Sequence, residues 1–270
     1  MQQPSSNGTV LDRILAARRA EVEHRKKVLP LTALKYGVKA ASAPRDFAGA
    51  LGGPGLNVVA ELKPASPSRG VIRDPFDAAS LAGSLAAAGA AALSVLTEGE
   101  FFQGSLKNLR DARKEVSLPV LRKDFIFDPW QVWEARANDA DSFLLIVAAL
   151  PDSGLVDLVA LGRELGMEPL VEVHTRSEAE RAVSAGAKII GVNNRDLKTL
   201  DVRIEVSLEL IEHIPEDRIV VSESGLSSHR ALEELRSAGF DAFLVGEQLM
   251  LAPDPGAELA ALLGKPDGSV

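Results

Sequence analysis

A glutamate and a lysine stand two positions apart in the otherwise apolar run VVAELK, a pattern typical of a buried β-strand. Because side chains two apart on a strand point to the same face, Glu61 and Lys63 share one face, while Ala60 and Leu62 occupy the other. A lysine beside a carboxylate in an enclosed site can serve as a general acid or can clamp a substrate carboxylate. The run therefore indicates a charged site at the end of a strand, followed by a Ser-Pro-Ser loop.

Other apolar runs also end in ionisable or amide side chains, so the charged site does not depend on one strand. A glutamate whose pKa is raised by burial can accept a proton near neutral pH, and Lys123 and Glu172 fit the roles of acid and base. Schiff-base chemistry is the competing use of such a lysine. Each residue alone could be a solvated rim residue or half of an ion pair, but five strands ending this way favour a shared site. The other strand-end candidates include His174, Asn193, Arg195, Glu223 and Ser224.

The elements that must position these residues follow an alternating pattern. From about residue 56 onward, short apolar runs alternate with stretches of helical period, which is typical of βαβ units in a parallel sheet. Eight such runs begin near residues 57, 92, 119, 142, 168, 188, 218 and 241. This count favours an α/β fold of the closed (β/α)8 TIM-barrel type over an open sheet, which usually has five or six strands and a Gly-rich first turn. Ligands of such barrels bind at the carboxyl ends of the strands, so the strand-end residues are expected to meet at one mouth.

The start of the chain does not join the repeat. Residues 1–50 are predicted to form an N-terminal helical extension packed on the barrel, with one long amphipathic helix and a second, shorter one. Residues 51–270 are predicted to form the barrel, so that the chain is a single domain overall. We expect the extension to cap the barrel or to border the mouth of its active site.

A separate phosphate site is indicated at the ends of the seventh and eighth strands. The segments SESG and VGEQLM place Gly225 and Gly246 where barrels of this type often hold phosphate on backbone N–H groups and a helix N-terminus. The backbone at Glu247 belongs to the same predicted site, and Ser66 in the first loop could add a hydroxyl. A glycine after a strand is usually only a turn, but two such loops together favour phosphate binding.

Composition excludes several classes of function. The net charge of -8, with Lys and Arg scattered along the chain, argues against a nucleic-acid partner, which requires a basic stripe. The chain has no cysteine and its four histidines show no short ligand spacing, so no metal site is predicted. The first residues lack the apolar core of a signal peptide, and the longest apolar run, FLLIVAAL, is too short to span a membrane. These features indicate a cytoplasmic protein without a membrane partner.

The motifs, taken in order, resemble those of the indole-3-glycerol-phosphate synthase family of tryptophan biosynthesis. The resemblance rests on E-x-K-x-x-S-P-S from Glu61, then LRKDFI, LVEVH, IGVNNRDLKT and VSESGL, and it covers nearly the whole chain, including the helical extension. It implies a (β/α)8 barrel that converts 1-(2-carboxyphenylamino)-1-deoxyribulose 5-phosphate into indole-3-glycerol phosphate, with loss of carbon dioxide and water. No metal or organic cofactor is expected. The implied partner is this small phosphorylated, anthranilate-derived substrate, and the chain is expected to be a monomer or weak homo-oligomer.

Carried over by position, the resemblance implies a role for each candidate residue. Lys123 would be the general acid on the ketone oxygen during ring closure, and Glu172 the acid and base of the dehydration. Lys63 would hold the substrate carboxylate, either as a binding group alone or with a share in proton transfer, and Glu61 would lie beside it. Asn193 and Ser224 complete the catalytic group. The remaining roles are substrate contact by Arg195, a seventh-strand rim at Glu223, an anthranilate pocket at Phe125, and phosphate binding at Ser66, Gly225, Gly246 and the backbone of Glu247.

One departure and two alternatives accompany this interpretation. Glu247 and Gln248 stand where the family commonly carries at least one small residue, which puts a side-chain contribution to phosphate binding in doubt. Another phosphate-binding barrel, such as a phosphoribosyl isomerase, would need an acid and base pair of another type and has no reason for the E-x-K-x-x-S-P-S segment. A non-catalytic barrel scaffold would be favoured by loss of Lys123 or Glu172, and both are present.

Overall fold

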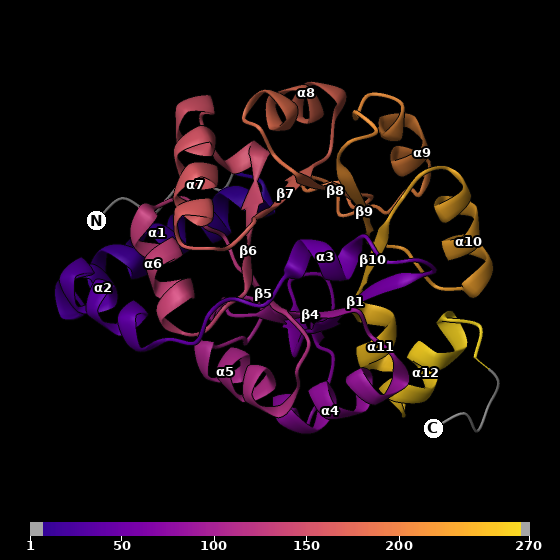
Figure 1. Ribbon diagram of the computed structural model, residues 1–270, viewed down its shortest axis with the longest axis horizontal. Helices are drawn as coiled ribbons and strands as arrows, with labels where there is room; N and C mark the ends of the chain where they lie inside the picture. The colour runs from indigo at the N-terminus through magenta and orange to yellow at the C-terminus, as the bar shows by residue number, and fades with distance from the viewer. Residues whose placement is uncertain (1–7, 266–270) are drawn as a thin grey trace.

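A closed ring of eight parallel strands, surrounded by helices, forms the centre of the computed structural model, which describes residues 8–265 (Figure 1). The outer ends of both predicted segments, residues 1–7 and 266–270, lie outside the described residues. The ring closes where β1 pairs with β10, which confirms the predicted (β/α)8 barrel and each of its eight strands. The barrel strands are β1 (Asn57–Leu62), β4 (Ala92–Leu96), β5 (Val120–Lys123), β6 (Ser142–Ile146), β7 (Leu170–Val173), β8 (Ile189–Asn193), β9 (Ile219–Glu223) and β10 (Ala242–Val245).

Helices follow the strands and cover the outside of the ring (Figure 1). Most of them begin after a Ser, Thr or Asp whose side chain accepts a hydrogen bond from the first helical turn, as at Asp77, Ser105, Asp128 and Thr175. Local sequence therefore sets where these helices begin. The helices that follow the strands, capped or not, are α4 (Ala78–Ala88), α5 (Leu106–Glu115), α6 (Pro129–Ala137), α7 (Asp152–Glu164), α8 (Arg176–Ser184), α9 (Glu205–Ile211), α10 (His229–Ser237), α11 (Glu247–Leu251) and α12 (Pro255–Leu262), with a 3-10 turn at Val147–Ala149.

Two short strands lie outside the barrel. β2 (Ala65–Ser66) and β3 (Gly70–Val71) pair antiparallel, so the Ser-Pro-Ser segment forms the turn of a small hairpin after β1. The backbone N–H of Ala65 donates to the carbonyl of Phe102 at 3.2 Å, which ties this hairpin to the loop after β4.

The two faces of each strand pack in different layers. Val59 of β1 belongs to an apolar cluster inside the ring, whereas Ala60 and Leu62 pack in the layer between strands and helices. Because side chains alternate along a strand, the residue two positions after a lumen-facing one also faces the lumen, nearer the carboxyl end. Charged lumen residues that follow such apolar positions are Glu61, Lys123, Glu172 and Glu223.

The N-terminal extension contacts both ends of the barrel. It contains α1 (Val10–Val28), α2 (Leu31–Ala40) and α3 (Phe47–Leu51). Phe47 and Leu51 of α3 join the lumen cluster, and Leu51 accepts a hydrogen bond from Asn57 at the amino end of β1, so α3 caps that end. The first turn of α1, with Leu11, lines a pocket at the opposite end. The extension thus caps the barrel and also borders its mouth.

A buried ionic network attaches α1 to the barrel. The guanidinium of Arg18 donates to both carboxylate oxygens of Asp124, at 3.0 and 2.7 Å. Asp124 also accepts hydrogen bonds from Thr97 at 2.6 Å and from Arg122 at 2.9 Å, while Arg122 pairs with Glu134 of α6 at 2.9 Å. Burial opposes ionisation of Asp124, but Arg122 and Arg18 outweigh it and lower its pKa to about 2.

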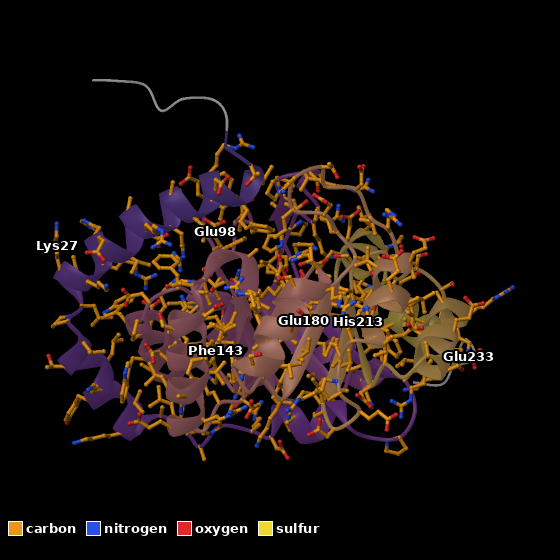
Figure 2. The ribbon with its side chains drawn as sticks, turned by 90° about the horizontal axis from the view of Figure 1, so that it is seen from above. Lys27, Glu98, Phe143, Glu180, His213 and Glu233 are labelled. Carbon is orange, nitrogen blue, oxygen red and sulfur yellow. The ribbon has the colours of Figure 1, made fainter. Side chains whose placement is uncertain are left out.

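Figure 2 shows α1 lying along the outside of the barrel, with Lys27 in the last turn of the helix. Among residues 8–265, no helix combines the length and the apolar character that crossing a bilayer requires.

Candidate active site

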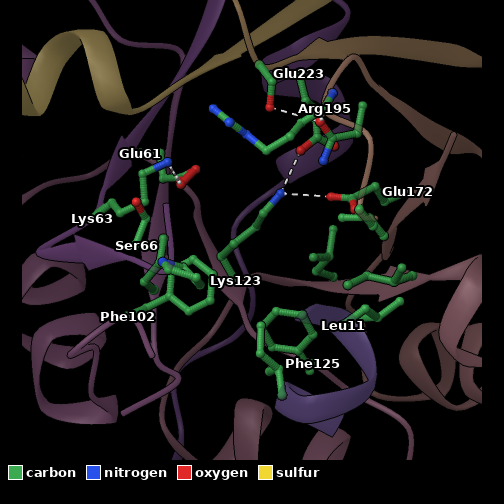
Figure 3. Close-up of a pocket in the computed structure, with 18 of the residues that line it drawn as sticks. Leu11, Glu61, Lys63, Ser66, Phe102, Lys123, Phe125, Glu172, Arg195 and Glu223 are labelled. Atoms are coloured by element: carbon green, nitrogen blue, oxygen red, sulfur yellow. Dashed lines mark hydrogen bonds and ion pairs between the residues drawn. The ribbon is translucent and has the colours of Figure 1, made fainter. Parts of the chain in front are cut away.

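A pocket at the carboxyl ends of the strands brings the predicted residues together (Figure 3). Every residue predicted to be catalytic lines it, and so does every residue predicted to contact the substrate. They come from five strands and their loops, as expected for a barrel mouth. These residues are Glu61, Lys63, Lys123, Phe125, Glu172, Asn193, Arg195, Glu223 and Ser224.

Lys123 lies between two carboxylates at the centre of the pocket (Figure 3). Its Nζ donates to Glu172 Oε2 at 3.0 Å and to Glu223 Oε2 at 2.6 Å. The side chain of Lys123 is 13% exposed, and those of Glu172 and Glu223 are 3% and 1% exposed. Three ionisable groups are therefore held in contact with one another and almost out of contact with solvent.

The pKa values of these groups follow from burial and from one another. Burial opposes the charged form of Lys123, but Glu223, Glu172 and Glu61 outweigh it and raise the lysine pKa above its ordinary value. Burial also opposes ionisation of Glu172, yet Lys123 and His174 hold its pKa below the ordinary value. Burial and the negative charge of Glu172 raise the pKa of Glu223, and together they outweigh the lowering effect of Lys123, so that this pKa is about 7.

These shifts correct two expectations from the sequence. The carboxyl group whose pKa is raised towards neutrality is Glu223, not Glu172. Glu223 was expected at the rim of the seventh strand, but it projects into the lumen and contacts Lys123 directly. Glu223 stands two residues after the lumen-facing Val221, just as Glu61 stands two residues after Val59. The alternation of side chains along the strand could therefore have predicted that Glu223 faces the lumen.

A glycine on β8 makes room for Glu223. A Cβ atom added to Gly191 would lie 2.2 Å from Oε1 of Glu223 and 3.2 Å from Cδ1 of Leu170. Any larger side chain at position 191 would therefore displace the carboxylate that bonds to Lys123.

Glu61 and Lys63 form the second charged group of the pocket. Lys63 Nζ lies 3.2 Å from Glu61 Oε1, and the two side chains are 15% and 5% exposed, so they share one face as the strand period predicted. A Cβ on Gly246 of the neighbouring strand end would come within 2.9 Å of Glu61 side-chain atoms. Gly246 therefore gives the Glu61 carboxylate its space beside β10.

Asn193, Ser224 and Arg195 are joined at the ends of β8 and β9. The hydroxyl of Ser224 donates to Asn193 Oδ1 at 2.8 Å, and the backbone N–H of Arg195 donates to the same oxygen at 3.0 Å. Ser224 has a positive φ of 69°, a conformation that a non-glycine residue adopts only at a cost. The side-chain amide of Asn193 also helps to lower the pKa of Glu172.

An apolar wall faces the charged groups. Phe125 lines the pocket as predicted, and its ring lies 5.9 Å from that of Phe102, centroid to centroid. Phe102, Leu11 and Ile14 were not selected from the sequence, although they also line the pocket. Leu11 and Ile14 lie three residues apart on an amphipathic helix, which indicated burial but not the surface on which they would pack.

The predicted phosphate residues divide between two adjoining hollows. Gly225 and Gly246 line a hollow together with the backbone after β9 and β10, and Ser66 lines the main pocket instead. Glu247 lines both. Its carboxylate lies 2.7 Å from Arg69 Nε and 3.5 Å from Arg195 Nη2, so two cations gather beside the glycine loops.

Within residues 8–265, no group of three or more His, Cys, Asp or Glu side chains is arranged to hold a metal ion. The chemistry that these contacts support is general acid and base catalysis by a lysine and two glutamates, on a substrate with both an aromatic part and anionic parts.

Comparisons with known proteins give a consistent result. A family model described as "Indole-3-glycerol phosphate synthase" matches residues 11–262. A curated protein of that name from Burkholderia ambifaria is 48% identical over 257 residues, covering 94% of this chain and 98% of the relative. One of the same name from Burkholderia vietnamiensis is 47% identical over 259 residues, with the same coverage.

Solved structures with low sequence identity share the fold alone. A 3-hexulose-6-phosphate synthase matches with a TM-score of 0.63 at 16% identity, covering 77% of this chain and 99% of that one. Orotidine 5'-phosphate decarboxylase from Pyrococcus horikoshii matches with a TM-score of 0.59 at 15% identity, covering 76% of this chain and 97% of that one.

Proposed function

Because the chain belongs to the indole-3-glycerol phosphate synthase family, we propose a residue-level route by which its barrel mouth forms indole-3-glycerol phosphate. The substrate is 1-(2-carboxyphenylamino)-1-deoxyribulose 5-phosphate. The reaction closes the pyrrole ring and releases carbon dioxide and water, so the enzyme is a carbon-carbon lyase.

The observation that carries the proposal is the position of Lys123 between Glu172 and Glu223. The two neighbours keep the buried amine protonated, so it can give a proton to the substrate ketone oxygen while the aromatic carbon attacks. A proton donor that is already fixed in place stabilises the charge that develops on this oxygen without reorganisation of water. Lys123 is therefore proposed as the general acid of ring closure.

The two glutamates are proposed to divide the dehydration between them. Glu172 has a lowered pKa, so it is ionised and can remove a proton from the carbon beside the nitrogen. Glu223, with a pKa of about 7, is protonated in a large share of the molecules at neutral pH, and in this form it can protonate the departing hydroxyl, directly or through Lys123. The raised and lowered pKa values thus separate an acid from a base within one buried cluster.

The remaining contacts support a binding mode for the substrate. Phe125 and Phe102 form an apolar wall suited to the anthranilate ring. Lys63, held by Glu61, is the cation proposed to bind the carboxylate until it is lost as carbon dioxide. The phosphate is assigned to backbone N–H groups at Gly225, Gly246 and Glu247, with Arg195 lining the same hollow and Ser66 lining the adjoining main pocket. Asn193 and Ser224 orient Arg195.

The proposal predicts that purified protein converts this substrate into a product with indole absorbance and fluorescence, with one carbon dioxide released for each indole formed. An isomerase would instead turn over a phosphoribosyl substrate without forming indole, and a scaffold would bind ligand without turnover. Binding of the carboxyphenylamino substrate without indole formation would therefore reject the proposed reaction.

We also propose that the helical extension and the barrel act as one domain in a monomer or weak homo-oligomer. Contacts between Arg18 and Asp124 and the presence of Leu11 in the pocket support a single domain, since they join the extension to the barrel and its site. Light scattering across a range of protein concentrations tests the oligomeric state, and a single unfolding transition tests the single domain. A cytoplasmic location stays a prediction of the sequence, for cell fractionation to test.

A further inference from the structure

His174 lies two residues after Glu172, at the carboxyl end of β7, and its ring is next to the Glu172 carboxylate. Its ring stands between two carboxylates, with Nε2 at 3.5 Å from Glu172 Oε1 and Nδ1 at 3.4 Å from Glu178 Oε2. Both ring nitrogens are buried, and neither has a hydrogen-bond partner among the described residues. The backbone N–H of His174 donates to Glu178 at 2.7 Å, which holds this carboxylate of α8 beside the ring.

His174 also separates two hollows. Glu172 lines the active-site pocket but not its neighbour, a hollow of about 600 Å³ that is lined by His174 and Glu178. Asn193 and Arg195 line both, so the two hollows adjoin. The imidazole ring therefore forms part of the wall between the buried acid and base cluster and a second space on the outer side.

The proposed reaction requires a supply of protons to the buried cluster, provided that the proposed function holds. The substrate enters with an ionised carboxylate and loses it as neutral carbon dioxide. One proton goes to the ketone oxygen and a second leaves with the hydroxyl as water, while only one returns from the carbon beside the nitrogen. Each turnover therefore consumes one proton, which must reach the buried Lys123, Glu172 and Glu223 cluster from solvent.

We propose that His174 is a positioning and proton-relay residue that carries this proton from the outer hollow to Glu172. The neutral ring, with its proton on Nε2, accepts a second proton at Nδ1 from Glu178 or from water in the outer hollow, and the imidazolium then gives the Nε2 proton to Glu172 Oε1. Exchange of the remaining Nδ1 proton to Nε2 through water restores the starting tautomer. A histidine suits this task because its two ring nitrogens can release one proton and accept another. The distances of 3.4 and 3.5 Å require a small approach of ring and carboxylates at each transfer.

The charges around the His174 ring favour its protonated form. Carboxylates face it from three elements, namely Glu172 of β7, Glu178 of α8 and Glu223 of β9, and Asp196 in the loop after β8 adds a fourth. The cation across the cluster is Lys123. Burial opposes protonation of the ring, but Glu178 and Glu172 outweigh it and raise the His174 pKa above its ordinary value.

The test compares His174→Gln with the wild-type enzyme in the indole assay above, at pH 8, where free protons are scarce. We expect kcat to fall by about tenfold or more while KM stays within about twofold, because the relay supplies protons and does not bind substrate. Added imidazole should restore kcat in proportion to its concentration, whereas a bulky buffer of similar pKa should not. His213→Gln, at an exposed histidine, is the matched control and should behave as wild type.

A purely structural role for His174 gives a different pattern. Unchanged kcat in His174→Gln, or a loss that imidazole does not restore, would overturn the proposal. If this variant does not fold, Glu178→Gln takes its place, since glutamine can still accept the backbone hydrogen bond of His174. Its kcat should also fall and become dependent on imidazole, and full activity without that dependence would overturn the relay. Absence of indole formation by the wild type would instead reject the proposed function, so the two failures are distinguishable.

Discussion

Lys123 donates a 2.6 Å hydrogen bond to Glu223, a residue that is 100 positions later in the chain. β5 and β9, which carry the two residues, lie on opposite sides of the eight-stranded ring. The contact crosses the lumen, so it exists only when the barrel is closed. The acid of the proposed reaction and the carboxyl group that adjusts its strength are therefore products of the complete fold.

Replacement of Lys123 by methionine should remove ring closure and leave binding. The methionine side chain has a similar length but no proton to give, so kcat should fall by about a hundredfold or more. KM should change little, because an acid that acts in the transition state contributes to kcat and not to affinity. Steady-state indole fluorescence measures both constants. Wild-type kcat in Lys123→Met would remove Lys123 from the acid role.

Glu223→Gln should remove a titration near pH 7. Above this pH the wild-type Glu223 is ionised and holds the Lys123 proton more tightly, so kcat should decline as pH rises through about 7. The variant stays neutral throughout but has no proton to give to the departing hydroxyl, so its kcat should fall by about tenfold or more at pH 6 and should lack the decline near pH 7. The pH profile of kcat measures the difference, with Glu180→Gln on the exposed face of α8 as control.

Stability should show the same titration. The folded-state pKa of Glu223 is raised from 4.5 to about 7, so the folded protein binds a proton that the unfolded chain has released. The free energy of unfolding should therefore decline as pH rises between these values, and Glu223→Gln should reduce the decline. Urea unfolding at pH 5 and pH 8 measures the free energy of unfolding of both proteins. An equal loss between these pH values in wild type and Glu223→Gln would contradict the assignment.

Gly191→Ala should damage catalysis more than folding. The added methyl group would lie 2.2 Å from Glu223 Oε1, and the flexible end of this side chain can move away. We expect the bond from Lys123 to lengthen and kcat to fall by about tenfold or more, with a loss of about 1–3 kcal/mol in stability from overpacking. Chemical unfolding and the indole assay together separate the two effects. An alanine variant with wild-type kcat would show that the position of Glu223 is unimportant.

Arg18→Met should destabilise the enzyme and weaken substrate binding. Removal of the guanidinium leaves the buried Asp124 carboxylate with Arg122 as its remaining cation, at an expected cost of about 3 kcal/mol. Since α1 carries Leu11 and Ile14 into the pocket, KM should rise with the loosening of the helix. Arg13→Met, at an exposed position on the same helix, is the control. Equal unfolding midpoints in the two variants would contradict the role of the network.

Glu247→Gln should strengthen substrate binding. The Glu247 carboxylate lies among Arg69 and Arg195 and competes with phosphate for the same cations. Its neutral replacement should lower KM by about two- to fivefold, the size expected for one partly exposed charge. The difference should shrink at high ionic strength, because salt screens such charges. A higher KM in the variant would indicate that Glu247 instead holds the arginines in place for the phosphate.

Much of the fold and site could be predicted from the sequence because both depend on short-range regularities. The alternation of apolar runs with helical stretches is sufficient for the barrel, and period two along β1 is sufficient to put Glu61 and Lys63 on one face. The carboxyl ends of parallel strands share one edge, so residues such as Lys123 and Glu172 had to meet at one mouth.

Only the tertiary structure decided which groups touch and how they ionise. The same strand end sends Lys123 into the lumen and Arg122 outward to α6, and closure of the ring then pairs Lys123 with a strand on the far side. A pKa depends on burial and on every neighbouring charge, so the raised value falls on Glu223, whereas the sequence pointed to Glu172. Period and motif are local properties of the chain, but desolvation and Coulomb interactions are summed over residues that only folding brings together.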